Sequence, residues 1–286
     1  MQIGQTATYA RTYTQEDFDR FARLSGDNNP IHVDPEFSAR TKFGKTVAPG
    51  MLLFSTIERC LGAQLPGSGT MQLTQELRFP NPTFVGQEIT VQLEVNALTS
   101  SNSAEISTHI VHPDGKMGCV GKSRVALPGT RIDFNQAAFE APLYESEVQA
   151  HRGLNIGQAA EETRVFKRDD LIEFLDLVDE TNAIFTDRAH AQSMGFQDVP
   201  LPGGLLGGMV SDLLGTQLPG RGTNWLKQHY HFLNPGYPEE EIIARVEILR
   251  LRPERDLVNL RTTLRNHKGE IVIDGEALVW VSDLET

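Results

Sequence analysis

The chain has little of what marks several large classes of protein. Its 286 residues include two cysteines, Cys60 and Cys119, and neither has metal-ligand spacing to another cysteine or to a histidine. Two cysteines are too few for a disulfide framework, so we expect both to be small buried hydrophobic side chains. No apolar run approaches the roughly 20 residues that cross a bilayer. We therefore expect no membrane partner and no disulfide scaffold.

Basic charge is also scarce. The 26 lysines and arginines are outnumbered by 38 acidic residues, which gives a net charge of -12. A nucleic-acid binder usually carries a basic patch or stripe, so this balance argues against nucleic acid as a partner. The first residues, MQIGQTATYARTYTQEDF, show neither the basic nor the apolar region of a signal peptide. A cytoplasmic location follows only as the default.

An internal repeat is the strongest feature that is present. When the chain is shifted by 153 residues, residues 61–82 align with residues 214–235, and thirteen of the 22 positions are identical. With the same shift Pro49-Gly50 aligns with Pro202-Gly203, and a one-residue slip is needed between about 39 and 48. Self-similarity of this kind predicts a duplicated structural unit.

The repeat sets the expected domain bounds. We expect a first domain over 1–129, a linker over 130–158 without a sustained period, and a second domain over 159–286. Because a tandem duplication usually replaces a homodimer, we expect the two copies to pack as a pseudo-dimer. Further association into a homodimer stays open.

Each copy combines helices with strands. Thr14 can cap a first helix, with Asp17 three residues later, and a second helix follows Pro49-Gly50, with Gly62 able to end it. Alternating apolar residues predict strands. These lie near residues 71–79, 88–95, 103–112, 117–127, 241–249, 257–264 and 271–281. The pattern favours an α+β fold in which an antiparallel sheet wraps around one central helix in each copy.

The loop 25-SGDNNPIHVD-34 carries the candidate chemistry. Pro30 disfavours helical geometry at Asn29, so the segment is expected to be a turn or an overhanging segment. Asp27 and His32 lie five residues apart on it, and a carboxylate with an imidazole can perform general acid/base catalysis near neutral pH. Asn29 can fix the turn. As an isolated pattern, the segment is equally typical of an ordinary turn after a helix.

A family resemblance favours the catalytic alternative. Gly-Asp-x-Asn-Pro-x-His, followed about twenty residues later by Pro-Gly-Met-Leu-Leu, resembles the motif of the MaoC-like, (R)-specific enoyl-CoA hydratases, and the likeness covers almost all of the first copy. It implies a tandem hotdog fold and reversible hydration of 2-enoyl-CoA to (R)-3-hydroxyacyl-CoA, that is, a hydro-lyase. An acyl-CoA is then the small-molecule partner, and CoA is part of the substrate, so we expect no cofactor and no metal.

The same resemblance implies the site residues. Asp27 and His32 are the implied catalytic pair, while Gly50, Asn29 and Met51 are implied in substrate binding. The Gly50 N–H would bind the thioester carbonyl oxygen, where hydration builds enolate charge that a preorganised donor stabilises. Which member of the pair is the acid and which the base stays open, as do the acyl group and acyl carrier protein as an alternative to CoA.

Two positions depart from the family pattern. Many members carry His where this chain has Pro49, and many carry Ser where it has Glu58. Glu58 can face solvent or line the pocket, and we favour the solvent.

The second copy has lost the pair. Asp27 aligns with Glu180 and His32 aligns with Phe185, so we expect this half to be catalytically inactive. Asp179 lies one position off and cannot replace the pair. The glycine-rich run 201-LPGGLLGGMVSDLLG-215 is consistent both with a widened acyl pocket and with tight helix packing.

Two other functions remain open. The first is a thioesterase of the same fold, which would use an acidic residue of the central helix such as Glu58. The second is a non-catalytic subunit that binds acyl thioesters. His229 and His231 share one face of a predicted strand, and a polar strand face is favoured there over a metal pair.

Overall fold

The computed structural model describes residues 1–99, 101–131, 134, 144 and 148–285. One ten-stranded antiparallel sheet runs through them, in the order β1-β3-β4-β5-β2-β9-β12-β11-β10-β8. The first half supplies β1 (Thr6–Thr12), β2 (Met71–Arg78), β3 (Glu88–Leu98), β4 (Ser103–Val111) and β5 (Met117–Ala126), and the second supplies β8 (Ala159–Val165), β9 (Asn224–Phe232), β10 (Glu241–Arg252), β11 (Leu257–Asn266) and β12 (Ile271–Trp280). The short strands β6 (Ala150–His151) and β7 (Leu154–Asn155) form a separate hairpin.

The two halves join through β2 and β9. Glu76 lies opposite His229, its own counterpart after the 153-residue shift, and Arg78 lies opposite Lys227. This register is symmetric about the Glu76–His229 pair, as expected for two copies of one unit related by a two-fold axis. The halves therefore pack as a pseudo-dimer with a continuous sheet, which the repeat predicted.

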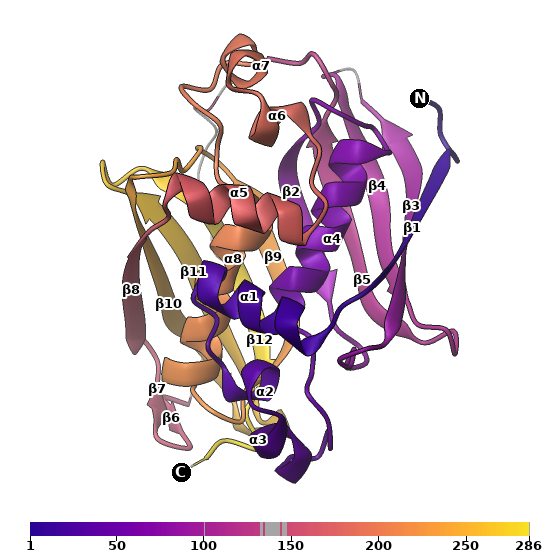
Figure 1. Ribbon diagram of the computed structural model, residues 1–286. Coiled ribbons are helices and arrows are strands. Elements are labelled where there is room, and N and C mark those ends of the chain that lie inside the picture. The colour runs from indigo at the N-terminus through magenta and orange to yellow at the C-terminus, as the bar shows by residue number, and fades with distance from the viewer. Residues whose placement is uncertain (100, 132–133, 135–143, 145–147, 286) are drawn as a thin grey trace.

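Two central helices lie side by side on one face of the sheet (Figure 1). These are α4 (Gly50–Ala63) and α8 (Gly203–Asp212), the latter continued by a π-helical turn, Leu213–Gln217. A Cβ on Gly204 would lie 2.1 Å from Ser55 Oγ, and one on Gly208 would lie 2.3 Å from Ser25 Cβ. The glycines of this run thus permit close helix packing, which favours that alternative over a widened pocket.

The expected end of the first central helix was wrong by one residue. α4 continues through Gly62 to Ala63, and Gln64 is its C-cap. A Cβ on Gly62 would lie 2.7 Å from Asn182 Cβ, so the glycine serves close packing against the second half.

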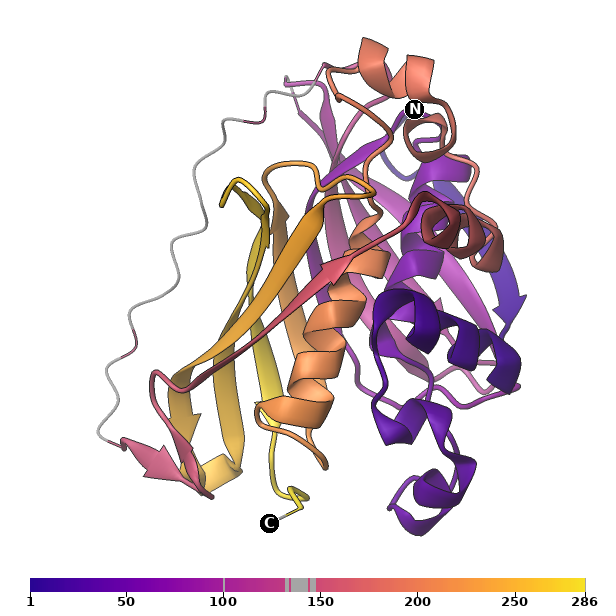
Figure 2. The ribbon, with the colours of Figure 1, turned by 60° about the vertical axis from the view of Figure 1, so that its left-hand side comes forward.

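Further helices lie beside the central pair and toward its ends (Figure 2). In the first half they are α1 (Gln15–Ser25), α2 (Pro30–Val33) and α3 (Pro35–Arg40), and in the second α5 (Arg168–Leu177), α6 (Ala183–Thr186) and α7 (Arg188–Ser193). Thr14 and Asp17 form the expected capping box of α1. The rings of Phe21 and Phe174, which are counterparts, lie 6.3 Å apart between α1 and α5.

The sequence patterns did not predict some of the helices and strands. The edge strands β1 and β8 are exposed or half-buried along their lengths, so they lack buried apolar residues in alternation. The loop after Asn29 contains two short helices instead of an irregular turn. Much of the predicted linker, 130–158, lies outside the described residues. Both cysteines are buried and free, and no helix in the described ranges is long and apolar enough to span a membrane.

Candidate active site

The candidate loop is shaped by its glycine, asparagine and proline. Gly26 ends α1 with φ 93°, a left-handed conformation that glycine adopts without strain, and its N–H donates to Ala22 O at 2.8 Å. Asn29 caps α2, accepting the Ile31 N–H at 3.3 Å, and Pro30 occupies the first helical position. The single turn of α2 then places His32 beside the preceding loop.

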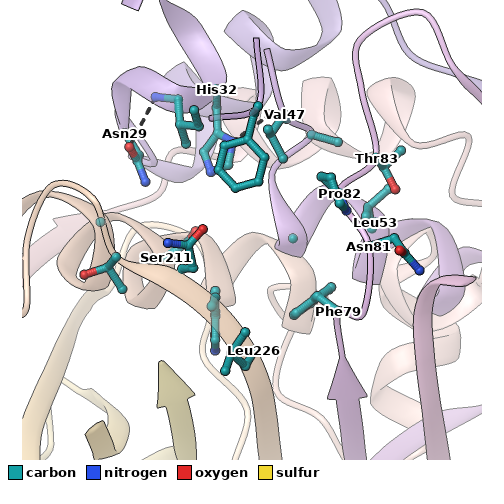
Figure 3. Close-up of a pocket in the computed structure, with 18 of the residues that line it drawn as sticks. Asn29, His32, Val47, Leu53, Phe79, Asn81, Pro82, Thr83, Ser211 and Leu226 are labelled. Atoms are coloured by element: carbon teal, nitrogen blue, oxygen red, sulfur yellow. Dashed lines mark hydrogen bonds between the residues drawn. The ribbon is translucent and has the colours of Figure 1, made fainter. Parts of the chain in front are cut away.

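The imidazole of His32 is held in one orientation. Its Nδ1 lies 2.7 Å from the carbonyl oxygen of Val47 (Figure 3). A carbonyl can only accept a hydrogen bond, so Nδ1 carries the proton and, in the neutral ring, Nε2 has a free lone pair. The side chain is 9% exposed. His32 therefore offers one fixed proton acceptor to the site.

The carboxylate of Asp27 lies on the Nε2 side of this ring. Its Oδ2 is 3.9 Å from His32 Nε2, a distance too long for a direct hydrogen bond. Asp27 is fully buried, and neither carboxylate oxygen has a hydrogen-bond partner among the described residues. Burial raises the pKa of Asp27, against the lowering influence of His32 and of the nearby Ser211 hydroxyl. The structure thus brings the predicted pair together with a gap that one water can bridge.

A cavity of about 300 Å³ opens beside the pair. Asn29, His32 and Gly50 line it, as the sequence predicted (Figure 3). The Met51 side chain does not. It is fully buried where the central helices meet, with Sδ 3.9 Å from Tyr230 Oη. A role for Met51 at the site would have to come from its backbone.

The start of α4 offers unused hydrogen-bond donors to the cavity. No described group accepts a hydrogen bond from the Gly50 N–H. A Cβ on Gly50 would lie 3.1 Å from Phe79 Cζ, so glycine also relieves crowding there. A helix N-terminus carries a partial positive charge, which favours a partially negative oxygen at this point.

The second half builds much of the cavity wall. Its contributions include Ser211, Leu214, Gly215, Trp225, Leu226 and Trp280. In addition, Asp212 Oδ1 accepts the Asn28 N–H at 3.0 Å, and this bond joins the candidate loop to α8. Ser211, Leu214 and Gly215 belong to the glycine-rich run 201–215, for which an acyl pocket was one of the two alternatives. Trp225, Leu226 and Trp280 were not predicted as part of the site.

The corresponding loop of the second half is built differently. Glu180 folds back on its own loop, its Oε1 accepting the N–H groups of Thr181 and Asn182 at 2.8 Å each. Phe185 stands where His32 would be and lines a much smaller cavity of about 50 Å³. Asp179 lies on the surface, where it accepts a hydrogen bond from Tyr9 Oη at 2.8 Å. The geometry agrees with the predicted loss of the pair.

Glu58 does not face the solvent, so the favoured interpretation was wrong. The residue is 7% exposed and lines the small cavity of the second half. Its Oε1 accepts the Gly203 N–H at 2.9 Å and its Oε2 accepts the Gly204 N–H at 3.0 Å. The unsatisfied N–H groups at the start of a buried helix attract a carboxylate. The sequence alone could not show that the start of α8 lies opposite Glu58.

The remaining histidine pair lies on the sheet. The rings of His229 and His231 are 4.4 Å apart, and burial lowers the pKa of both. Within the described ranges no group of three or more His, Cys, Asp or Glu side chains is arranged to hold a metal.

Both halves of the chain resemble known protein families. Residues 2–112 match the family described as "MaoC like domain", and residues 151–275 match "FAS1-like, dehydratase domain region". An (R)-specific enoyl-CoA hydratase of Aeromonas caviae is 40% identical over 129 residues, which is 45% of this chain and 96% of that protein. A second (R)-specific enoyl-CoA hydratase, from Rhodospirillum rubrum, is 33% identical over 44% of this chain and 87% of its own length.

Solved structures share the fold over nearly the whole chain. A MaoC-like dehydratase superposes with a TM-score of 0.78 over 97% of this chain and 98% of that one, at 14% identity. A Mycobacterium tuberculosis protein described as having a double hotdog fold gives 0.77 over 98% and 96%, again at 14% identity.

A continuous antiparallel sheet that wraps around two central helices defines this protein as a double hotdog. With the hydratase motif in its first half, the chain belongs to the MaoC-like hydratase/dehydratase family.

Proposed function

We propose that the first half catalyses the reversible hydration of a 2-enoyl-CoA to an (R)-3-hydroxyacyl-CoA. The observation that carries this proposal is the gap of 3.9 Å between Asp27 Oδ2 and His32 Nε2, both buried beside a cavity whose wall includes Gly50. The carboxylate oxygens lack partners and the imidazole nitrogen has a free lone pair, so one water held between them would satisfy both.

The chemistry requires that the pair share one proton. One member is protonated when the substrate binds. The other member removes a proton from the bound water as its oxygen attacks C3, and the protonated member delivers its own proton to C2, so that the elements of water are added across the double bond and the pair again holds one proton. The enolate charge that develops on the thioester oxygen falls at the start of α4, where the Gly50 N–H can donate to it. Losing one such donor typically costs about 3–4 kcal/mol. The reverse sequence dehydrates the hydroxyacyl thioester.

The cavity wall supports an acyl group as the substrate. Leu53, Phe79, Leu214 and Leu226 supply apolar surface around a few polar side chains, which include those of Asn29, His32 and Ser211. A volume of about 300 Å³ is at the lower end of small-molecule sites, which favours a short acyl chain. The (R) configuration and CoA as the carrier follow the names of the two hydratase relatives.

The thioesterase alternative loses its main support. Glu58, the acidic residue of the central helix, lines the other cavity and is bonded to the second half. It therefore cannot act together with His32 on one thioester.

Hydration of crotonyl-CoA, followed as loss of the conjugated thioester absorbance, tests the proposal. We expect activity in the wild type and its loss in His32→Ala and in Asp27→Asn, with a thiol reagent showing no free CoA. Release of CoA without hydration would establish a thioesterase. Tight binding of butyryl-CoA without either reaction would establish a binding subunit.

A further inference from the structure

The two central helices begin in the same way but have different neighbours. Gly50 starts α4 and Gly203 starts α8, and these residues are counterparts after the 153-residue shift. The Gly50 N–H has no acceptor among the described residues, and Gly50 lines a cavity of about 300 Å³. The Gly203 and Gly204 N–H groups are both occupied by the carboxylate of Glu58. The donors that remain available in one half are already used in the other.

The same aligned position in each half carries the side chain that lies near the start of the opposite central helix. Glu58 lies on α4 and points to the start of α8, while its counterpart Ser211 lies on α8 and lines the cavity at the start of α4. A serine is too short to reach the opposite N–H groups, whereas a glutamate reaches both. A Cβ on Gly203 would lie 3.2 Å from Glu58 Oε1, so the carboxylate comes directly against the helix backbone. The difference between the two cavities therefore begins with one side chain.

We propose that Glu58 is a built-in ligand of the second half. Its carboxylate occupies the start of α8, the place where the first half would receive a thioester carbonyl, and so each chain takes up one acyl thioester instead of two. This inference rests on the proposed function, because it takes the start of α4 as the carbonyl site. It explains why the second cavity keeps the helix glycine although it has lost the catalytic pair.

The surroundings of Glu58 fit a closed site. Phe185 and Phe232 fill the space beside it, and the remaining cavity measures about 50 Å³. Among the described residues, the one other acid that acts on it is Glu180, whose own carboxylate accepts hydrogen bonds from the loop of the second half. The site thus holds one carboxylate against two donors, and no described cation pairs with it.

Glu58→Ser in the full chain gives the first test, because it copies what Ser211 already provides in the other half. The variant leaves two buried N–H groups without an acceptor, and at about pH 8 we expect its Tm to fall by about 3–6 °C. Sodium acetate, which supplies a small carboxylate, should restore at least about half of this loss, and sodium chloride at equal ionic strength should not. The wild type should respond equally to both salts.

Two results would overturn the inference. An unchanged Tm would show that α8 does not depend on the carboxylate. A lowered Tm that acetate does not restore would show that Glu58 is a helix cap only. If Glu58→Ser does not fold, Glu58→Asp replaces it: its carboxylate is one methylene too short to accept from both N–H groups, so the Tm should fall and acetate should restore part of the loss, and a Tm that acetate does not raise counts against the inference.

The reciprocal variant tests the equivalence of the two helix starts. Ser211→Glu should place a carboxylate at the Gly50 N–H, so that binding of butyryl-CoA weakens by about 100-fold or more while the chain stays folded. Ser211→Gln, which adds the same length without the negative charge, is the matched control and should weaken binding less than Ser211→Glu does. Undiminished binding in Ser211→Glu would refute the equivalence. If the wild type neither binds butyryl-CoA nor hydrates crotonyl-CoA, the proposed function fails, while the acetate experiment still decides the role of Glu58.

Discussion

Asp27, the carboxylate of the proposed catalytic pair, should lower the stability of the folded protein. Its side chain is fully buried, and both carboxylate oxygens lack a hydrogen-bond partner among the described residues. An ionised group in such a place has lost its water without a full replacement. Asp27→Asn keeps the shape of the side chain and removes the charge. We expect this variant to be inactive and more stable than the wild type.

The sign follows from the pKa of Asp27, which burial raises above its usual value of 3.8. Because the folded state holds the proton more tightly than the unfolded chain, the wild type loses stability as pH rises from the unfolded to the folded pKa. The gain in Asp27→Asn should therefore be largest above neutrality and disappear in acid. Removing one poorly satisfied buried charge is worth about 1–3 kcal/mol, or a rise in Tm of about 2–6 °C.

Thermal unfolding and crotonyl-CoA hydration, measured on the same samples, check this expectation. Hydration should fall by about 10²–10⁴-fold, which is the usual contribution of a general acid or base. Asp19→Asn is the matched control, because Asp19 is exposed on α1 and accepts only a hydrogen bond from Gln15 at 2.9 Å. A Tm of Asp27→Asn that equals or lies below that of the wild type at alkaline pH would refute the reasoning.

Three further predictions follow from close contacts and burial. Burial raises the pKa of Glu58 from 4.5 to about 7, so the free energy of unfolding of the wild type should fall as pH rises between these values, by about 3 kcal/mol at most. In denaturant titrations at several pH values, Glu58→Gln should remove this dependence on pH. A variant that keeps the wild-type pH dependence would contradict the shift. Gly204→Ala should cost about 1–3 kcal/mol of unfolding free energy, because its Cβ would meet Ser55 Oγ at 2.1 Å; a variant as stable as the wild type would show that the helices can separate freely. Gly215→Ala should lower kcat/KM by about 10²-fold with little change in Tm, because its Cβ would meet Asn29 Nδ2 at 2.1 Å and displace the loop that carries His32. A fall in Tm as large as that of Gly204→Ala would argue against a local effect.

The sequence by itself determined the repeat and the class of fold, and it indicated the candidate loop. The duplication was visible because both copies keep the same turns and strand alternation, and local rules are enough to place such elements. The Asp27–His32 loop was also readable, because its spacing, its Pro30 and the glycine after α1 act within a few residues of one another.

Only the tertiary structure decided how the two halves complete each other's sites. Ser211 reaches the active cavity, Asp212 holds the catalytic loop, and Glu58 closes the opposite helix start, and each of these contacts joins residues more than 140 positions apart. Nothing local in the sequence indicates which helix N-terminus a buried glutamate will find. That choice depends on the two-fold packing of α4 against α8, where unsatisfied N–H groups of one half meet the side chains of the other.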